Sequence, residues 1–167
     1  MQLLFCLETN KKADTDWVYI HETILHFYKK SQDRMRPIYM GTKMNLLQKK
    51  TGADIEKCKR EYPGETCVVV CTDTDHFDCN LEQKRDNEKI DKFCREKGYL
   101  HVWFCRDIEE VYRGKSVTSK EKTGAAAQFR STHGIRKCEE KSLSRERYAY
   151  GTSNILCVLD RLLDRKE

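Results

Sequence analysis

Residues 66–79 have the sequence TCVVVCTDTDHFDC, in which an apolar run ends abruptly at three aspartates. The run from Cys67 to Cys71 is typical of a β-strand buried on both faces, as in a parallel sheet. In such sheets ligands bind outside the carboxyl ends of the strands, where exposed loops are held by a rigid framework. Asp73 and Asp75 are therefore candidate metal ligands. The alternative is that Asp73 and Asp78 are turn and helix-capping residues, a common use of Asp after a strand.

The composition predicts a soluble protein of one domain. The chain has 167 residues, of which 35% are charged and 38% hydrophobic, and this length suffices for one buried core. No apolar stretch approaches the roughly 18–20 residues that span a bilayer, so we expect no membrane partner. Glu8 comes too early for a secretory signal, which favours a cytoplasmic location. The nine cysteines lie mostly in apolar patterns without any CxxC pair, which indicates buried free thiols rather than a zinc site.

Apolar runs typical of strands alternate with amphipathic segments typical of helices. The predicted strands are residues 3–7, 36–41, 67–71 and 99–105. The predicted helices are residues 15–30, 46–62 with a break near Gly52, 81–97, 106–115, and a closing helix at 152–166. This alternation predicts an α/β sandwich: a central, mainly parallel sheet of about four strands flanked by helices. We expect residues 1–167 to form a single domain.

Positive charge is concentrated in the second half of the chain. The formal net charge is +5, and residues 112–147 alone hold ten Lys and Arg against four Asp and Glu. This stretch is rich in Ser, Thr, Gly and Lys, so we expect a basic flexible segment at about 113–150 with a few helical turns at most. Such a concentration of charge typically attracts phosphates.

Acidic residues follow three of the predicted strands. Glu8 follows the first strand, Asp73 and Asp75 follow the third, and Glu109 or Glu110 follows the fourth. If the first and third strands are neighbours, Glu8 faces the aspartate pair. Carboxylates brought so close repel one another unless a cation lies between them. Ligands that are all oxygen favour Mg²⁺ or Mn²⁺, and such an ion can activate water and stabilise charge on a phosphodiester.

This set of motifs resembles the Toprim fold of topoisomerases, primases and OLD-type nucleases, and more closely the RloB family of small bacterial Toprim-like proteins. The resemblance covers most of the chain, and its motifs keep their order. The chain departs from the family pattern at Thr9, which replaces a glycine, and at Asp16, which replaces a glutamate. The matching motifs are LLFCLE ending at Glu8, Thr15-Asp16-Trp17-Val18-Tyr19, Asp73-Thr74-Asp75, Glu109-Glu110-Val111-Tyr112 and Thr152-Ser153-Asn154-Ile155.

The resemblance implies a nuclease that depends on Mg²⁺ or Mn²⁺ and hydrolyses phosphodiester bonds of nucleic acid, with RNA or tRNA favoured over DNA. It also implies an antiphage defence system in which an ATPase is the partner protein. Glu8, Asp73 and Asp75 would bind the metal, and Glu110 would complete the site. An oligomer is compatible with the sequence. Basic residues expected at the same edge of the sheet, where they would contact phosphates, are Lys11, Lys12, Arg106, Arg113 and Lys115.

Two other functions use the same residues. A non-catalytic Toprim-like module would dock nucleic acid or a partner ATPase, and the missing glycine after Glu8 favours this interpretation. A nucleotidyl or phosphoryl transferase would use a similar metal site, but the chain has no glycine-rich phosphate loop. Tyr148 and Tyr150 adjoin basic residues, a pattern that fits either base stacking or packing against the last helix.

Overall fold

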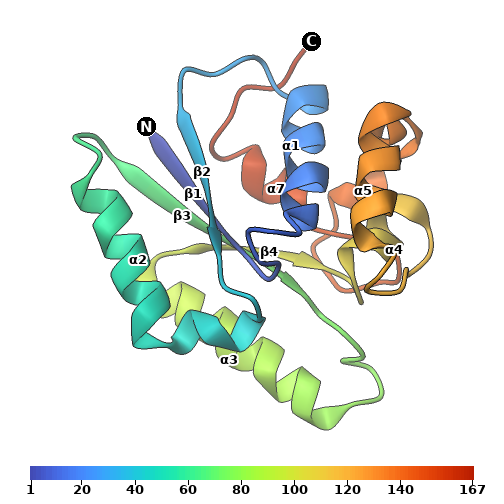
Figure 1. The fold of residues 1–167 in the computed structure, drawn as a ribbon, viewed down its shortest axis with the longest axis horizontal. Helices are drawn as coiled ribbons and strands as arrows, with labels where there is room; N and C mark the ends of the chain where they lie inside the picture. Colours follow the sequence, from blue (N-terminus) through green and yellow to red (C-terminus); the bar gives the residue numbers. More distant parts are fainter.

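The structure, a computed structural model, describes residues 1–167. Its centre is a four-stranded sheet in the order β2-β1-β3-β4, and all three strand pairings are parallel. The predicted α/β fold, a parallel sheet flanked by helices, is confirmed (Figure 1). The strands are β1 (Gln2–Leu7), β2 (Arg34–Tyr39), β3 (Thr66–Asp73) and β4 (Leu100–Phe104).

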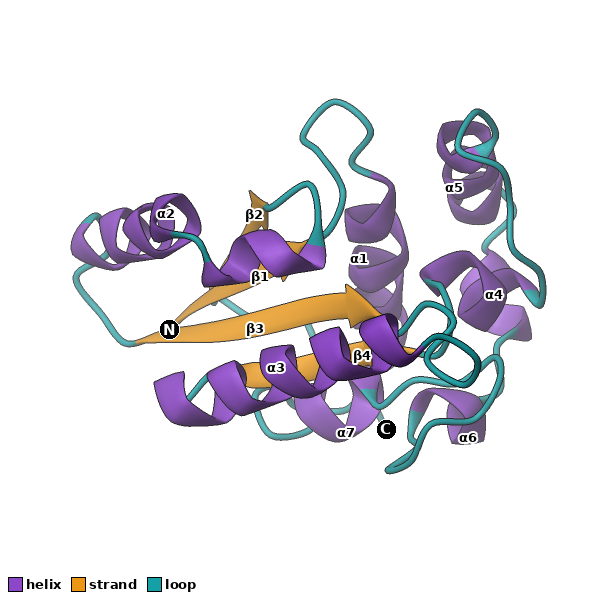
Figure 2. Cartoon of the chain, turned by 90° about the horizontal axis from the view of Figure 1, so that it is seen from below, coloured by secondary structure: helices purple, strands orange, loops and turns teal.

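Helices cover both faces of the sheet. In Figure 1, α2 and α3 lie on one side, whereas α1 and α7 lie on the other with α4 and α5 beyond them. Figure 2 shows the same layering from below, with α3 in front of β4. The helices are α1 (Thr15–Phe27), α2 (Lys49–Arg60), α3 (Leu81–Lys97), α4 (Ile108–Arg113), α5 (Lys122–Ser131), α6 (Glu140–Leu143) and α7 (Ile155–Leu159), with 3₁₀ helices η1 (Lys43–Leu47) and η2 (Gly134–Lys137).

Strand β1 separates two hydrophobic cores. Every residue of β1 is fully buried, because alternate side chains of a central parallel strand enter opposite cores. Phe5 belongs to the core beneath α1, α5 and α7, while Leu4 belongs to the core beneath α2 and α3. Because β1 lies between β2 and β3, the residue after its carboxyl end, Glu8, is held at the middle of the sheet edge.

Helices α2 and α3, which cover one face of the sheet, agree with the sequence patterns except at one glycine. Helix α3 begins after Asn80, whose side chain accepts hydrogen bonds from two backbone N–H groups, and ends at Gly98, where φ is +67°. The expected break near Gly52 is wrong, because α2 continues through that residue. A glycine costs a helix only about 1 kcal/mol relative to alanine. The burial of Ile55 and Cys58 on the inner face of α2 offsets that cost.

The expectation of a flexible segment at 113–150 is wrong for most of its length. Residues 122–143 form α5, η2 and α6, and α5 packs against α1. Phe129 is 3% exposed, and its ring centroid lies 4.9 Å from that of Tyr19. The polar composition concealed a sparse apolar face, because few residues of this segment are hydrophobic but most of those few are buried. The loops 114–121 and 144–150 are mostly exposed and without regular structure.

The closing helix is much shorter than residues 152–166. Residues 152–154 instead run along the outer edge of β4, where the backbone N–H of Cys105 donates to the Thr152 carbonyl at 2.9 Å. This contact covers an otherwise open edge strand. After α7 the chain turns back toward the end of α1, where Tyr28 and Arg165 form an isolated antiparallel bridge. These two pairings leave only residues 155–159 in helical geometry.

Most of the cysteines lie in buried or half-buried positions, and Cys79 is exposed. All nine are free. Five of them are buried, and burial raises the pKa of Cys6 to about 12. No helix in the chain combines the length and the apolar character needed to cross a bilayer.

Candidate active site

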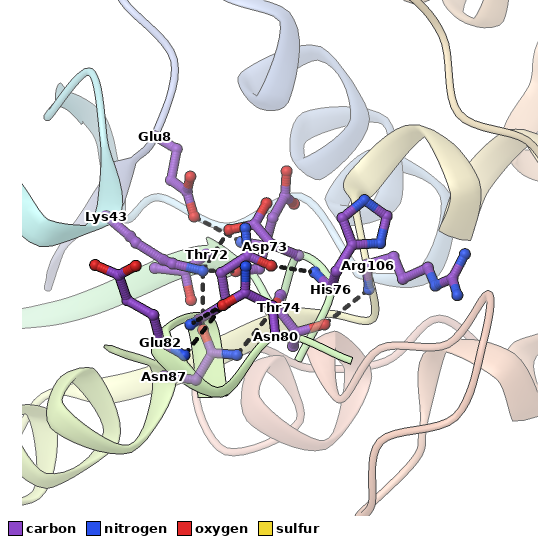
Figure 3. Close-up of polar contacts among 12 residues, drawn as sticks. Glu8, Lys43, Thr72, Asp73, Thr74, His76, Asn80, Glu82, Asn87 and Arg106 are labelled. Atoms are coloured by element: carbon purple, nitrogen blue, oxygen red, sulfur yellow. Dashed lines mark hydrogen bonds and ion pairs between the residues drawn. The ribbon is translucent and has the colours of Figure 1, made fainter. Parts of the chain in front are cut away.

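Glu8 and Asp73 meet at the carboxyl edge of the sheet. Leu7 pairs with Cys71, so Glu8, which follows β1, lies beside the last residues of β3, Thr72 and Asp73. The Asp73 backbone N–H donates to Glu8 Oε1 at 2.7 Å (Figure 3). The Asp73 carboxylate in turn accepts from the Ile108 N–H at 3.0 Å, which ties the end of β3 to the start of α4. The expected meeting of Glu8 and Asp73 across neighbouring parallel strands is thus present in the structure.

A polar cavity of about 350 Å³ opens beside this pair. Its charged lining consists of Glu8, Asp73, Asp16 from the first turn of α1, and Lys122 from the first turn of α5. Four segments that are distant in the sequence therefore supply its walls. The remaining lining residues are Thr9, Asn10, Ala13, Thr15, Gly41, Ser119 and Thr123.

The three carboxylates of the cavity resist ionisation. Burial raises the pKa of Glu8 to about 8, against the opposing effects of Lys43 and the Asp73 N–H. Burial, followed by repulsion from Glu109, raises the pKa of Asp16 to about 7. Burial and then the charge of Glu8 raise the pKa of Asp73 well above its ordinary value. A cation in the cavity would remove these costs.

Glu109 lies beneath the cavity. Its side chain is fully buried, and burial raises its pKa. Lys122 Nζ lies 3.4 Å from Glu109 Oε2, but neither carboxylate oxygen makes an aligned hydrogen bond. Burial lowers the pKa of Lys122, yet the carboxylates of Glu109, Asp73 and Asp16 outweigh it and raise the pKa overall. The protein thus already stabilises one positive charge at this position.

No family model, curated protein or solved structure matches this chain. Within the chain, the donor set at the cavity is informative. It consists of carboxylate oxygens without a histidine or cysteine among the lining residues, and such a set suits Mg²⁺ or Mn²⁺. The side chains in their present rotamers do not form a group of three that converges on one ion. The donor chemistry fits a hard cation, and binding one would require the carboxylates to draw together.

Asp75 occupies a different position from Asp73. Its backbone has a φ of +51°, and its carboxylate pairs with Lys43 Nζ at 2.5 Å. Lys43 is 6% exposed and also donates to the Asp73 carbonyl and to Asn87 Oδ1, each at 2.9 Å. All three protons of this ammonium group are therefore used. Lys43 holds the turn that carries both aspartates, and Asp75 does not line the cavity.

Glu110 also lies apart from the cavity lining. Its backbone N–H donates to Asp107 Oδ1 at 2.8 Å, which caps α4. Its carboxylate lies 3.5 Å from the hydroxyl of Ser116, in the exposed loop. Of the two neighbouring glutamates, Glu109 is the one whose charge acts on Asp16 and Asp73.

The five basic residues expected at this edge have different surroundings. Lys11 and Lys12 are exposed in the loop that supplies Asn10 and Ala13 to the cavity wall, and Lys115 is exposed in the loop 114–121. Arg113 donates to the Ala125 carbonyl at 2.9 Å and to Gln128 Oε1 at 3.1 Å, so it fastens α5 to α4. Arg106 lies against the ring of Tyr150.

Sequence reasoning missed two residues of the cavity region and did not assign a third to the site. Nothing in the sequence distinguishes Lys122 from the other lysines of its segment, and nothing marks Lys43. Asp16 lies within a recognisable motif, but an acid in the first turn of a helix is usually a capping residue. Its 6% exposure is the feature that separates it from an ordinary cap.

A larger cavity, of about 550 Å³, lies between α4, α5 and α6. It contains Arg113, Lys137 and Glu139 but none of the buried carboxylates. Because carboxylates that resist ionisation are the feature that points to chemistry, we place the candidate active site at the smaller cavity.

Proposed function

We propose that this protein is a nuclease that depends on Mg²⁺ or Mn²⁺ and hydrolyses phosphodiester bonds, with RNA, including tRNA, favoured over DNA. The observation that carries the proposal is the presence of Glu8, Asp16 and Asp73 in one cavity at the carboxyl edge of the sheet. Three carboxylates that cannot ionise together without cost form a natural site for a divalent cation. The order of motifs that resembles the RloB family supports the same activity.

Each side chain has a distinct role in this proposal. Glu8, Asp16 and Asp73 would hold the ion, which supplies an activated water and stabilises charge on the phosphate. Lys122 lies in the cavity wall, where its ammonium group is placed to attract a phosphate. Lys43 is a positioning residue, because its contacts with the Asp73 carbonyl and Asp75 fix the turn.

The surroundings of the site fit an anionic polymer. Lys11 and Lys12 are exposed beside one wall of the cavity, and Lys115 lies in the loop that leads to Ser119 in the other wall. Exposed lysines supply affinity for phosphates without dependence on sequence. The free thiols favour a reducing compartment, and we place the protein in the cytoplasm with an ATPase as its partner.

A second function, a non-catalytic module that binds nucleic acid or the ATPase, is favoured by two observations. The carboxylates in their present rotamers do not converge on a single ion. Thr9 also stands where the family pattern has a glycine, directly after Glu8, and its hydroxyl is buried without a hydrogen-bond partner.

Cleavage assays separate these two functions. Labelled tRNA, single-stranded RNA and duplex DNA would be incubated with the protein in Mg²⁺ or Mn²⁺, with and without a chelator. We expect cleavage that the chelator abolishes and that Asp73→Asn lowers by about 100-fold or more, the usual loss when a group that stabilises transition-state charge is removed. Asp54→Asn, at an exposed position of α2, is the matched control. Binding without cleavage, with the partner present, would favour the non-catalytic module.

A further inference from the structure

An exposed tyrosine lies on the same edge of the sheet as the candidate active site. Tyr150 is 59% exposed, and the guanidinium of Arg106 lies 4.3 Å from the centroid of its ring. The Tyr150 hydroxyl donates to Asp78, and Arg106 lies 3.5 Å from the same carboxylate. We call these three residues, Tyr150, Arg106 and Asp78, the Tyr150 platform.

The ring of Tyr150 is held at two points. Its hydroxyl donates a hydrogen bond to Asp78, and the guanidinium of Arg106 lies against the ring. The hydroxyl of Tyr150 is therefore already hydrogen-bonded, and the part of the side chain that stays exposed is the aromatic ring. An aromatic ring that is already fixed loses little conformational entropy when a flat partner stacks on it.

The platform is joined directly to the turn that carries Asp73. The backbone N–H of Arg106 donates to Thr74 Oγ1 at 2.8 Å, and the N–H of Asp75 donates to the Arg106 carbonyl at 2.9 Å. Arg106 adopts a φ of +65° to make these contacts. Figure 3 shows Arg106 on the opposite side of Asp73 from Glu8. A polymer that crosses Asp73 would thus have the cavity on one side and the platform on the other.

The segment that carries Tyr150 is aromatic and basic. Tyr148 is 38% exposed and meets Phe77 and Trp103 edge to face at 5.0 Å and 4.8 Å, which anchors the segment to the sheet. Arg147 is exposed beside it. Aromatic faces interleaved with cationic side chains are the combination that binds single-stranded nucleic acid.

We propose that the Tyr150 platform binds an unpaired nucleobase of single-stranded nucleic acid, which stacks on Tyr150 while Arg106 and Arg147 attract the adjoining phosphates. The choice of nucleic acid as the ligand rests on the proposed function, but the binding needs no metal and no cleavage. A duplex hides its base faces, so the platform selects substrates with exposed bases. The substrate of the site would accordingly be a single-stranded or looped region of nucleic acid.

Binding of a short single-stranded RNA of mixed sequence tests this proposal. Fluorescence anisotropy would be measured in a chelator, so that no cleavage occurs, with the natural RNA and with an oligonucleotide of the same length that lacks all its bases. We expect wild-type protein to bind the natural RNA about 10-fold or more tightly than the abasic strand, given the usual contribution of one stacked base. Tyr150→Leu should remove this preference, whereas Tyr150→Phe should keep it.

Controls separate stacking from misfolding and from catalysis. Tyr62→Leu, just beyond the end of α2, removes a tyrosine away from the platform and should leave binding unchanged; circular dichroism would show that each variant is folded. The proposal that a base stacks on Tyr150 would be overturned by any of three results: equal binding of natural and abasic strands by wild-type protein, no binding of either strand, or unchanged binding by Tyr150→Leu. Cleavage that persists without any dependence on Tyr150 also counts against the platform alone. Base-dependent binding without cleavage would instead count against the nuclease activity alone.

Discussion

The side chain of Glu8 accepts a hydrogen bond of 2.7 Å from the backbone N–H of Asp73, 65 residues later in the chain. Adjacent parallel strands bring these residues together, because β1 and β3 are hydrogen-bonded neighbours in the sheet. The same edge receives Asp16 from α1 and Lys122 from α5. The acidic cavity is therefore a consequence of strand order combined with the packing of two helices.

The stability of the metal-free protein should fall as pH rises. The pKa of Glu8 is raised from 4.5 to about 8 and that of Asp16 from 3.8 to about 7, so between these limits the folded chain binds more protons than the unfolded chain. The free energy of unfolding then decreases with pH across this window. Urea denaturation at a series of pH values, in the presence of a chelator, measures this decrease in the free energy of unfolding. Added Mn²⁺ should stabilise the protein most at the alkaline end, and a flat pH profile would contradict the assignment.

Asp16→Asn should stabilise the metal-free protein at mildly alkaline pH. The substitution removes a buried carboxylate whose ionisation is opposed by burial and by Glu109. A gain of about 1–3 kcal/mol in the free energy of unfolding is expected, since each pKa unit corresponds to about 1.36 kcal/mol and the neighbouring acids share the effect. The same variant should bind Mn²⁺ more weakly. Asp54→Asn, on the exposed face of α2, should change neither property, and a destabilised Asp16→Asn would argue that its charge is needed for folding.

Lys43→Met should destabilise the protein by about 2–4 kcal/mol, the loss expected when a buried charged hydrogen-bond donor is removed. Asp75 and Asn87 would both lose their partner. Adding Asp75→Asn to Lys43→Met should recover part of the loss, because it removes the stranded negative charge. A double-mutant cycle by urea denaturation provides the measurement. Additive effects of the two substitutions would show that the ion pair contributes nothing.

Residues 122–143 should resist proteolysis. Limited digestion with trypsin, followed by mass spectrometry, should place the first cuts within residues 113–150 after Lys115, Lys120, Arg145 or Arg147, in the two exposed loops, although lysines and arginines also occur between them. Phe129→Ala should cost about 3–5 kcal/mol, as expected for a large-to-small change in a core, and should open the segment to the protease. Early cuts between residues 122 and 143 in wild-type protein would contradict the packing of α5 on α1.

The sheet and its first two acidic residues follow from local sequence patterns. The run from Cys67 to Cys71 identifies a strand buried on both faces, and Glu8 and Asp73 each end such a strand, so strand adjacency suffices to pair them. The ends of regular elements were less predictable. Residues 152–154 were expected to be helical but pair with the end of β4 instead. Nothing in the local sequence indicates whether their backbone bonds to a helix or to a strand.

The remaining site residues depend on long-range packing. Lys122 reaches the cavity because Phe129 docks α5 on α1. Glu109 lies beside Lys122, on a helix, α4, that begins at a hydrogen bond to Asp73. Lys43 is buried because Asn87 of α3 accepts from its ammonium group. Each of these lysines resembles a surface residue in the sequence, since only the fold brings acidic partners to it.

Calorimetric titration of Mn²⁺ at neutral pH is the sharpest test of the carboxylate site. If Glu8, Asp16 and Asp73 share one hard cation, wild-type protein should bind Mn²⁺ with release of protons, because carboxyl groups of raised pKa must ionise to bind the ion. Glu8→Gln and Asp73→Asn should both lose this binding, and Asp54→Asn should retain it. An absence of binding to wild-type protein, or equal affinity in Asp73→Asn, would show that these carboxylates do not form a metal site.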